Sequence, residues 1–137
     1  MRQLSYYIDT SVWNFLLEED RPEHRAATER FFSQSLQFGT LAISDVVLEE
    51  IQRASGPRRA ALQKLISRHQ PILLKRTEEA DELANRYVEA GLIPVRYRND
   101  ALHLAVAVIH DMDVVVSWNF EHLVRLTTRL GVNGLNK

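Results

Sequence analysis

The chain has 137 residues, enough for one domain with a sizeable core, and we expect a single domain over residues 1–137. It contains no cysteine, which excludes disulfides, thiolate zinc sites and a cysteine nucleophile. The formal net charge of −1 lacks the basic excess of many nucleic-acid binders, although an enzyme that holds few phosphates, or holds them through metal ions, needs none. The sequence shows no signal peptide and no apolar run of about 18 residues, so we expect a cytoplasmic protein without a membrane segment.

Short apolar segments alternate with helical segments along the chain. The apolar segments predict strands, at residues 4–8, 40–43, 71–74 and 113–117. The segments between them predict helices, at residues 10–17, 23–36, 45–54, 58–69, 78–90 and 100–110, with a last one from about Phe120. This alternation predicts an α/β domain with a mostly parallel sheet of about four to five strands, and the continuous valines of the last strand suit burial on both faces.

Capping residues and helix breakers set the predicted helix boundaries. Hydroxyl and amide side chains accept the N–H groups of a first helical turn, and glycine commonly ends helices. The predicted N-caps are Thr10 or Ser11, Ser44, Thr77 and Asn99. Gly39 and Gly91 are predicted to end helices, and Pro22 to stand at a helix start.

Polar side chains follow the predicted strands at the point where each strand ends. Asp9 follows the first strand, Asn119 follows the last, and Asp100 opens the most apolar helix. Because ligands of open α/β sheets bind outside the carboxyl ends of the strands, we expect these groups at one edge of the sheet. Each also has an ordinary explanation: Asp9 as a helix cap, Asp100 as a first-turn carboxylate favoured by the helix dipole, and Asn119 as a turn residue.

The helix after the second strand carries two neighbouring glutamates, which differ in direction. Glu50 lies on the flank of the apolar stripe that contains Val47 and Ile51, whereas Glu49 points nearly opposite. Glu49 also stands four residues before Arg53, the favourable order for an exposed ion pair. We therefore expect Glu50 in the site and Glu49 on the surface.

Three carboxylates, those of Asp9, Glu50 and Asp100, would repel one another if they met. At 4 Å and an effective dielectric constant near 20, each pair costs about 4 kcal/mol, a large share of an ordinary stability of about 5–15 kcal/mol. Either they lie apart, or a divalent cation holds them. His103 and His110 lack a second histidine at metal-ligand spacing, and we interpret both as helix-surface or core hydrogen-bonding residues. An all-oxygen site indicates Mg²⁺ or Mn²⁺ rather than Zn²⁺, and the chemistry of phosphodiester hydrolysis.

Four segments, YYIDTSVWN, ISDVVLEEI, NDALHLAVA and VVSWNFEHL, resemble in order and spacing the motifs of PIN-domain ribonucleases, and especially those of VapC-type toxins of bacterial toxin–antitoxin pairs. The resemblance runs from residue 4 to about residue 132. It implies a PIN-like α/β/α sandwich around a parallel sheet, an acidic site that depends on Mg²⁺ or Mn²⁺, and cleavage of single-stranded RNA. It also implies a cognate antitoxin protein as partner, and a homodimer.

The resemblance carries over to individual residues. Asp9, Glu50 and Asp100 match the first three acidic positions, and Asn119 falls where many members carry a fourth Asp. Ser11 matches a hydroxyl often found beside the first Asp. The neutral Asn119 leaves three formal charges in the site and indicates a weaker second metal site, and the chain also ends earlier than the family pattern leads us to expect.

The resulting hypothesis is that the three carboxylates hold one Mg²⁺, directly or through water, and that the ion binds a phosphate oxygen and activates a water. Attack of this water on phosphorus expels the 3′ oxygen and leaves a 5′-phosphate and a 3′-hydroxyl. Asn119 would orient metal-bound water or an acidic side chain. Arg96 and Arg98, just before Asp100, are candidates for binding neighbouring phosphates, and ordinary solvated loop charge is their alternative explanation.

Two other functions remain open at this point. A haloacid-dehalogenase-like phosphatase also places an Asp after its first strand, but it needs a second Asp two residues on, where this chain has Ser11. A non-enzymatic α/β interaction module would use the acidic edge to receive a protein partner. Such a module should show no thermal shift with Mg²⁺ or Mn²⁺.

Overall fold

A four-stranded, all-parallel sheet forms the centre of the protein, in a computed structural model that describes residues 3–35 and 39–119. The strands are β1 (Leu4–Ile8), β2 (Gly39–Ser44), β3 (Ile72–Leu74) and β4 (Val114–Val116). Their order in the sheet is β3-β2-β1-β4, so that β1 pairs with β2 on one side and with β4 on the other. The predicted parallel α/β architecture is confirmed.

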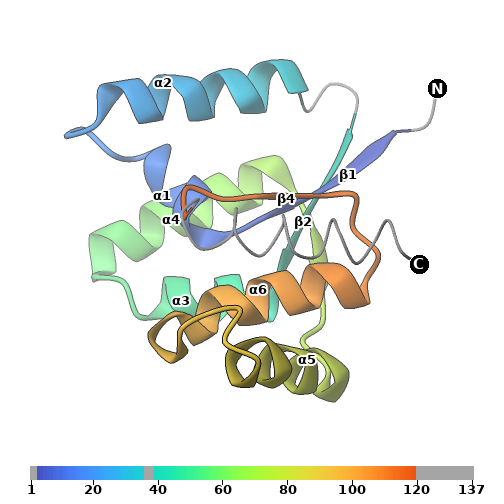
Figure 1. Ribbon diagram of the computed structural model, residues 1–137. Coiled ribbons are helices and arrows are strands. Elements are labelled where there is room, and N and C mark those ends of the chain that lie inside the picture. The colour runs from blue at the N-terminus through green and yellow to red at the C-terminus, as the bar shows by residue number, and fades with distance from the viewer. Residues whose placement is uncertain (1–2, 36–38, 120–137) are drawn as a thin grey trace.

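Helices connect successive strands and cover both faces of the sheet. They are α1 (Thr10–Phe15), α2 (Pro22–Arg30), α3 (Asp45–Gln52), α4 (Gly56–His69), α5 (Glu78–Glu89) and α6 (Arg98–Ile109). A π-helical turn (Phe31–Ser35) continues α2, and a 3₁₀ turn (Val95–Tyr97) precedes α6. Figure 1 shows α2 at the top of the view and α5 at the bottom, with the strands between them.

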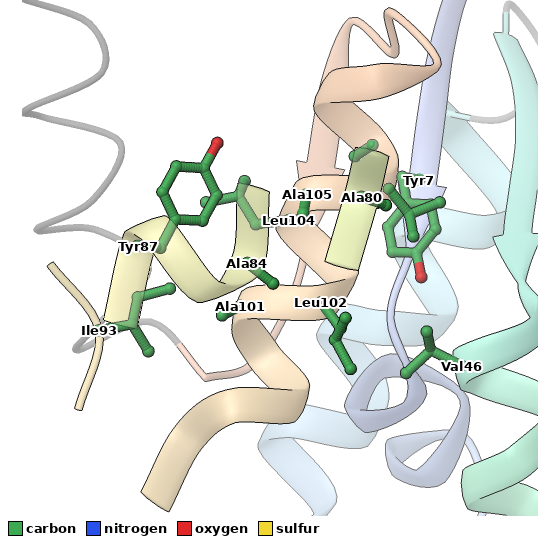
Figure 2. Packing of buried hydrophobic residues seen from close by; sticks show 12 residues of the cluster. Tyr7, Val46, Ala80, Ala84, Tyr87, Ile93, Ala101, Leu102, Leu104 and Ala105 are labelled. Atoms are coloured by element: carbon green, nitrogen blue, oxygen red, sulfur yellow. The ribbon is translucent and has the colours of Figure 1, made fainter. Parts of the chain in front are cut away.

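Two hydrophobic cores lie on opposite faces of the sheet, because successive residues of a strand point to opposite sides. Tyr7 of β1 belongs to a first core built with α5 and α6, whereas Ile8 belongs to a second core built with α1, α3 and α4. The small side chains of Ala80, Ala84 and Ala101 let α5 and α6 pack closely in the first core (Figure 2). The fold is therefore an α/β/α sandwich, and the polar edge of the sheet has rigid supports on both faces.

Two of the predicted N-caps are wrong. The N-cap of α1 is Asp9, whose carboxylate accepts a hydrogen bond from the backbone N–H of Ser11, so the acidic residue itself does the work expected of Thr10 or Ser11. Helix α6 begins at Arg98 rather than after Asn99, and the preceding residue makes no side-chain capping bond. The 3₁₀ turn lies directly before α6 and continues into its first turn, so no separate cap is needed.

Other boundaries agree with the expectations. The Ser44 hydroxyl accepts from the N–H of Val46 and caps α3, and Thr77 caps α5 in the same way. Gly91 follows α5 with a φ of +73°, a conformation that glycine adopts without strain. Gly39, predicted to end a helix, is instead the first residue of β2.

The remaining expectations concern residue 120 onward and the membrane. The helix predicted from Phe120 lies outside the described residues. Among the helices of residues 3–35 and 39–119, none has the length and hydrophobicity that crossing a membrane requires.

Candidate active site

The carboxylate of Asp9 is buried at the carboxyl end of β1, with only 1% of the residue exposed. Its Oδ1 accepts hydrogen bonds from the backbone N–H of Ser11 (3.0 Å) and from the Ser11 hydroxyl (2.5 Å). Burial raises the pKa of Asp9 above its ordinary value, and the nearby Asp100 carboxylate acts in the same direction. His103 and the hydroxyls of Ser11 and Ser117 oppose this rise without cancelling it. The ionised form of Asp9 therefore lacks full compensation within the described protein.

Asp100 and Asn119 meet where α6 begins and β4 has just ended. The Asn119 amide donates to Asp100 Oδ1 over 2.9 Å, and the Asn119 backbone N–H donates to the Ser117 hydroxyl over 2.9 Å. The backbone N–H of Trp118 donates to Ser11 Oγ, also over 2.9 Å. The segment after β4 thus connects the first acidic residue to the third through short hydrogen bonds.

Glu50 projects from α3 and makes its contacts with α6 and with the start of α1. Its Oε1 accepts from the Thr10 hydroxyl over 2.7 Å and lies 2.5 Å from His103 Nε2. Burial by itself raises the pKa of Glu50, but the hydrogen bonds from His103, Thr10 and Asn99 and the charge of His103 outweigh burial, so the net pKa is lowered. Glu50 is therefore anionic at neutral pH and held in place.

Glu49 takes the opposite direction, as the helical pattern predicts. Its side chain is 47% exposed, against 25% for Glu50. Its ion pair is with Arg76, at 3.4 Å between Arg76 Nη1 and Glu49 Oε2, rather than with the predicted Arg53. The surface position of Glu49 is confirmed, and its partner comes from across the fold instead of from the next helical turn.

The donor set suits a hard divalent cation, but the described part of the chain does not gather three ligands in one place. Within residues 3–35 and 39–119, no group of three or more acidic, histidine or cysteine side chains has the spacing of a metal site. Mg²⁺ usually takes only one or two protein carboxylates and keeps several waters, and a buried carboxylate with a raised pKa gains from a nearby cation. Asp9 and Asp100, with Asn119 beside them, fit that requirement. Direct ligation by Glu50 stays a prediction.

The comparison with protein families decides the classification. A family model described as "PIN domain" matches residues 6–122. The chain belongs to the PIN domain family. None of the curated proteins matches it.

Solved structures share the fold of this PIN domain. One, titled as VapBC2 from Rickettsia felis bound to a DNA fragment from their promoter, is 19% identical, with 89% of this chain and 92% of that chain covered and a TM-score of 0.62. Another is VapC20 of Mycobacterium tuberculosis, described as a Sarcin-Ricin loop cleaving toxin. It is 15% identical, with 87% and 93% covered and a TM-score of 0.64. Such likeness confirms the predicted PIN-like fold.

Several polar residues of the PIN domain's acidic edge had no role in the sequence-based site. Thr10 and Ser117 bond to the acidic residues, and Tyr7 lies behind them, bonded to His103 Nδ1 over 2.6 Å. Of the two interpretations for His103, core hydrogen bonding is the one observed, since the residue is 3% exposed. The signals in the sequence were the position of Thr10 next to Asp9 and that of Ser117 at the end of the last strand.

The two arginines before Asp100 differ in their surroundings. Arg98 donates to the side chain of Asn85 over 2.8 Å, and Arg96 is exposed with its guanidinium 4.9 Å from the centre of the Tyr97 ring. Arg96 thus presents a cation at the surface close to the start of α6. Phosphate binding by Arg96 and Arg98 stays a prediction.

Proposed function

We propose that this PIN-domain protein is an endoribonuclease that depends on Mg²⁺ or Mn²⁺ and hydrolyses phosphodiester bonds in single-stranded RNA. The observation that supports this most directly is the buried Asp9 carboxylate at the carboxyl end of the central strand, close to Asp100. Two anions within electrostatic reach of one another, in a site with oxygen ligands, favour binding of a hard divalent ion. Phosphodiester hydrolysis is the chemistry that such an ion assists.

The chain's own residues would prepare this site for RNA. Asp9 and Asp100 are the proposed ion-binding carboxylates, with Glu50 as a third, and when bound the ion supplies positive charge for the phosphate and a more acidic water. Ser11 orients Asp9 through its hydroxyl, and Asn119 orients Asp100 through its amide.

We further propose that the protein acts as the toxin of a bacterial toxin–antitoxin pair. Two of its structural neighbours are named as VapBC2 and as the toxin VapC20, which supports this assignment through the shared fold. A cognate antitoxin protein, a homodimer, one domain over residues 1–137 and a cytoplasmic location belong to the same proposal.

A groove between α1, α2 and α4 is a suitable place for the antitoxin. It encloses a volume of about 540 Å³ and is lined by both apolar and charged side chains. Leu17 and Phe32 contribute apolar surface, and Arg25, Lys64 and Arg68 contribute positive charge that outweighs the one carboxylate in the lining, that of Glu29. An amphipathic segment with acidic residues would complement this lining.

Asp100→Asn tests the enzymatic proposal, with Glu49→Gln as the matched control. Loss of an outer-shell partner of a metal already costs about 10–100-fold, so we expect loss of the Asp100 charge to lower Mn²⁺-dependent cleavage of single-stranded RNA by about 100-fold or more. Glu49 is exposed and paired with Arg76, so its variant should cleave like the wild type. Circular dichroism and thermal unfolding would verify that both variants fold.

The same experiment separates the alternative function. A wild-type protein that cleaves no RNA with either metal, and whose melting temperature does not respond to Mn²⁺, would be the non-enzymatic interaction module. Equal cleavage by wild type and Asp100→Asn would remove Asp100 from the site.

A further inference from the structure

Four side chains form a continuous line of hydrogen bonds from the core of the sheet to Glu50. The Tyr7 hydroxyl lies 2.7 Å from Ser44 Oγ and 2.6 Å from His103 Nδ1. His103 Nε2 in turn lies 2.5 Å from Glu50 Oε1. The first three residues are buried, and only Glu50 reaches solvent. Residues from β1, β2, α6 and α3 therefore converge on one carboxylate.

The hydrogen-bonding capacities of these groups give the line a direction. Ser44 Oγ already accepts from the N–H of Val46, so its own O–H is available to donate to Tyr7. Tyr7 keeps its proton, because burial raises its pKa far above the ordinary value, and it can then donate to His103 Nδ1. His103 Nε2 faces Glu50, and it carries a proton both in the imidazolium and in the neutral tautomer that accepts at Nδ1. In either form His103 is the donor to the Glu50 carboxylate.

We propose that His103, oriented by Tyr7, is a positioning residue that holds the Glu50 carboxylate at the acidic edge for ion binding. This role rests on the proposed nuclease function and deepens it. A free glutamate side chain samples many rotamers, whereas this one is anchored to a rigid group in the core. Placement within a fraction of an ångström is what a functional carboxylate requires, and it comes from supporting hydrogen bonds of this kind.

The surroundings of Tyr7 explain how the anchor stays fixed. Figure 2 shows the Tyr7 ring within the first core, with its hydroxyl on the side of Val46. The ring is 0% exposed, and the His103 ring lies beside it at 5.7 Å between centroids. Because interiors pack at crystal-like density, neither ring can turn without displacing its neighbours.

Two substitutions of His103 separate positioning from simple core packing. The amide nitrogen of glutamine reaches about as far as Nε2 and can still donate to Glu50, whereas the amide of asparagine ends near Nδ1 and cannot. We expect His103→Asn to weaken Mn²⁺ binding and RNA cleavage by about 10–100-fold, and His103→Gln to restore most of both. Mn²⁺ affinity is measured by calorimetry without RNA, and thermal unfolding is recorded for each variant.

A second measurement is independent of catalysis. ¹⁵N NMR of the imidazole in the metal-free protein should show a proton on His103 Nε2. An unprotonated Nε2 would overturn the proposal, as would equal Mn²⁺ affinity in His103→Asn, His103→Gln and the wild type. If the wild type neither binds Mn²⁺ nor cleaves RNA, the proposed function fails and takes the positioning role with it. If the wild type does both and the asparagine variant matches it, only the positioning role fails.

Discussion

The carboxylate of Asp9 accepts the backbone N–H of Ser11 and so caps α1, yet it is also a buried anion beside a second carboxylate. The two explanations offered by the sequence, a helix cap and a site residue, therefore do not compete. A cap needs only a hydrogen-bond acceptor, which an uncharged side chain can also supply. The negative charge of Asp9 is therefore not required for capping α1.

Substitution of Asp9 should separate these two roles. Asp9→Asn keeps a capping oxygen, whereas Asp9→Ala loses it, so in metal-free buffer we expect the asparagine variant to be more stable than the alanine variant by about 1 kcal/mol. Neither variant should cleave RNA. The measurement is urea unfolding at neutral pH, combined with a cleavage assay.

The pH dependence of the same variant follows from the raised pKa of Asp9. A carboxyl whose folded pKa is raised contributes stability at low pH that is lost as the pH rises through the folded pKa. As the pH rises above about 3.8, the ordinary pKa of an aspartate, the wild type should therefore lose stability. The free energy of unfolding of Asp9→Asn should rise relative to that of the wild type over the same pH range. If the variant is less stable than the wild type at pH 7, the ionised Asp9 carboxylate does not destabilise the folded protein.

For single residues, the direction of a side chain around its helix was the most reliable basis for prediction. The choice of Glu50 over Glu49 required only the position of the apolar stripe on α3, and exposed fractions of 25% and 47% agree with it. The pattern of a single helix could not predict the hydrogen-bond partners of Glu50. His103 lies 53 residues away in the chain, and only packing of α6 against α3 brings the two together.

At the level of elements, local chemistry predicted those boundaries that local contacts control. Ser44 and Thr77 cap helices because each side chain reaches an N–H two or three residues ahead. Asn99 has the same chemistry but lies inside α6, because the preceding 3₁₀ turn already has a helical direction. A capping residue predicts a boundary only where the incoming chain is extended.

Gly39 illustrates an element boundary set by a distant contact. A Cβ at this position would lie 2.4 Å from Cε2 of the Tyr6 ring and 2.8 Å from the carbonyl oxygen of Leu4. We expect Gly39→Ala to lower the free energy of unfolding by about 1–3 kcal/mol, because β1 or the Tyr6 ring must move. Chemical denaturation gives the value.

Gly56→Ala is the control for this prediction. A Cβ on Gly56 meets no atom within 4 Å, and the residue is exposed at the start of α4. Its stability should stay within about 0.5 kcal/mol of the wild type. Equal effects of the two substitutions would indicate loss of glycine flexibility rather than a clash at Gly39.

For the whole molecule, ion binding should appear as added stability. A ligand that binds only the folded state at a hundredfold excess over its Kd adds about 2.7 kcal/mol to the free energy of unfolding. We expect Mn²⁺ to raise the melting temperature of the wild type and not that of Asp9→Asn, with EDTA reversing the rise. The effect should weaken as the pH falls toward the raised pKa of Asp9, since a ligand carboxylate must be ionised. An equal rise in both proteins would place the ion elsewhere.

The order of apolar and polar segments by itself determined the parallel α/β fold, the approach of Asp9 and Asp100 to one edge, and the outward direction of Glu49. These features follow from periodicity and from the common direction of parallel strands, which act over a few residues or on every strand alike. Only the tertiary structure decided that the Glu50 carboxylate is hydrogen-bonded to His103, and that Tyr7 supports His103 from the core. Such contacts join residues tens of positions apart, and their partners depend on how the helices pack against the sheet.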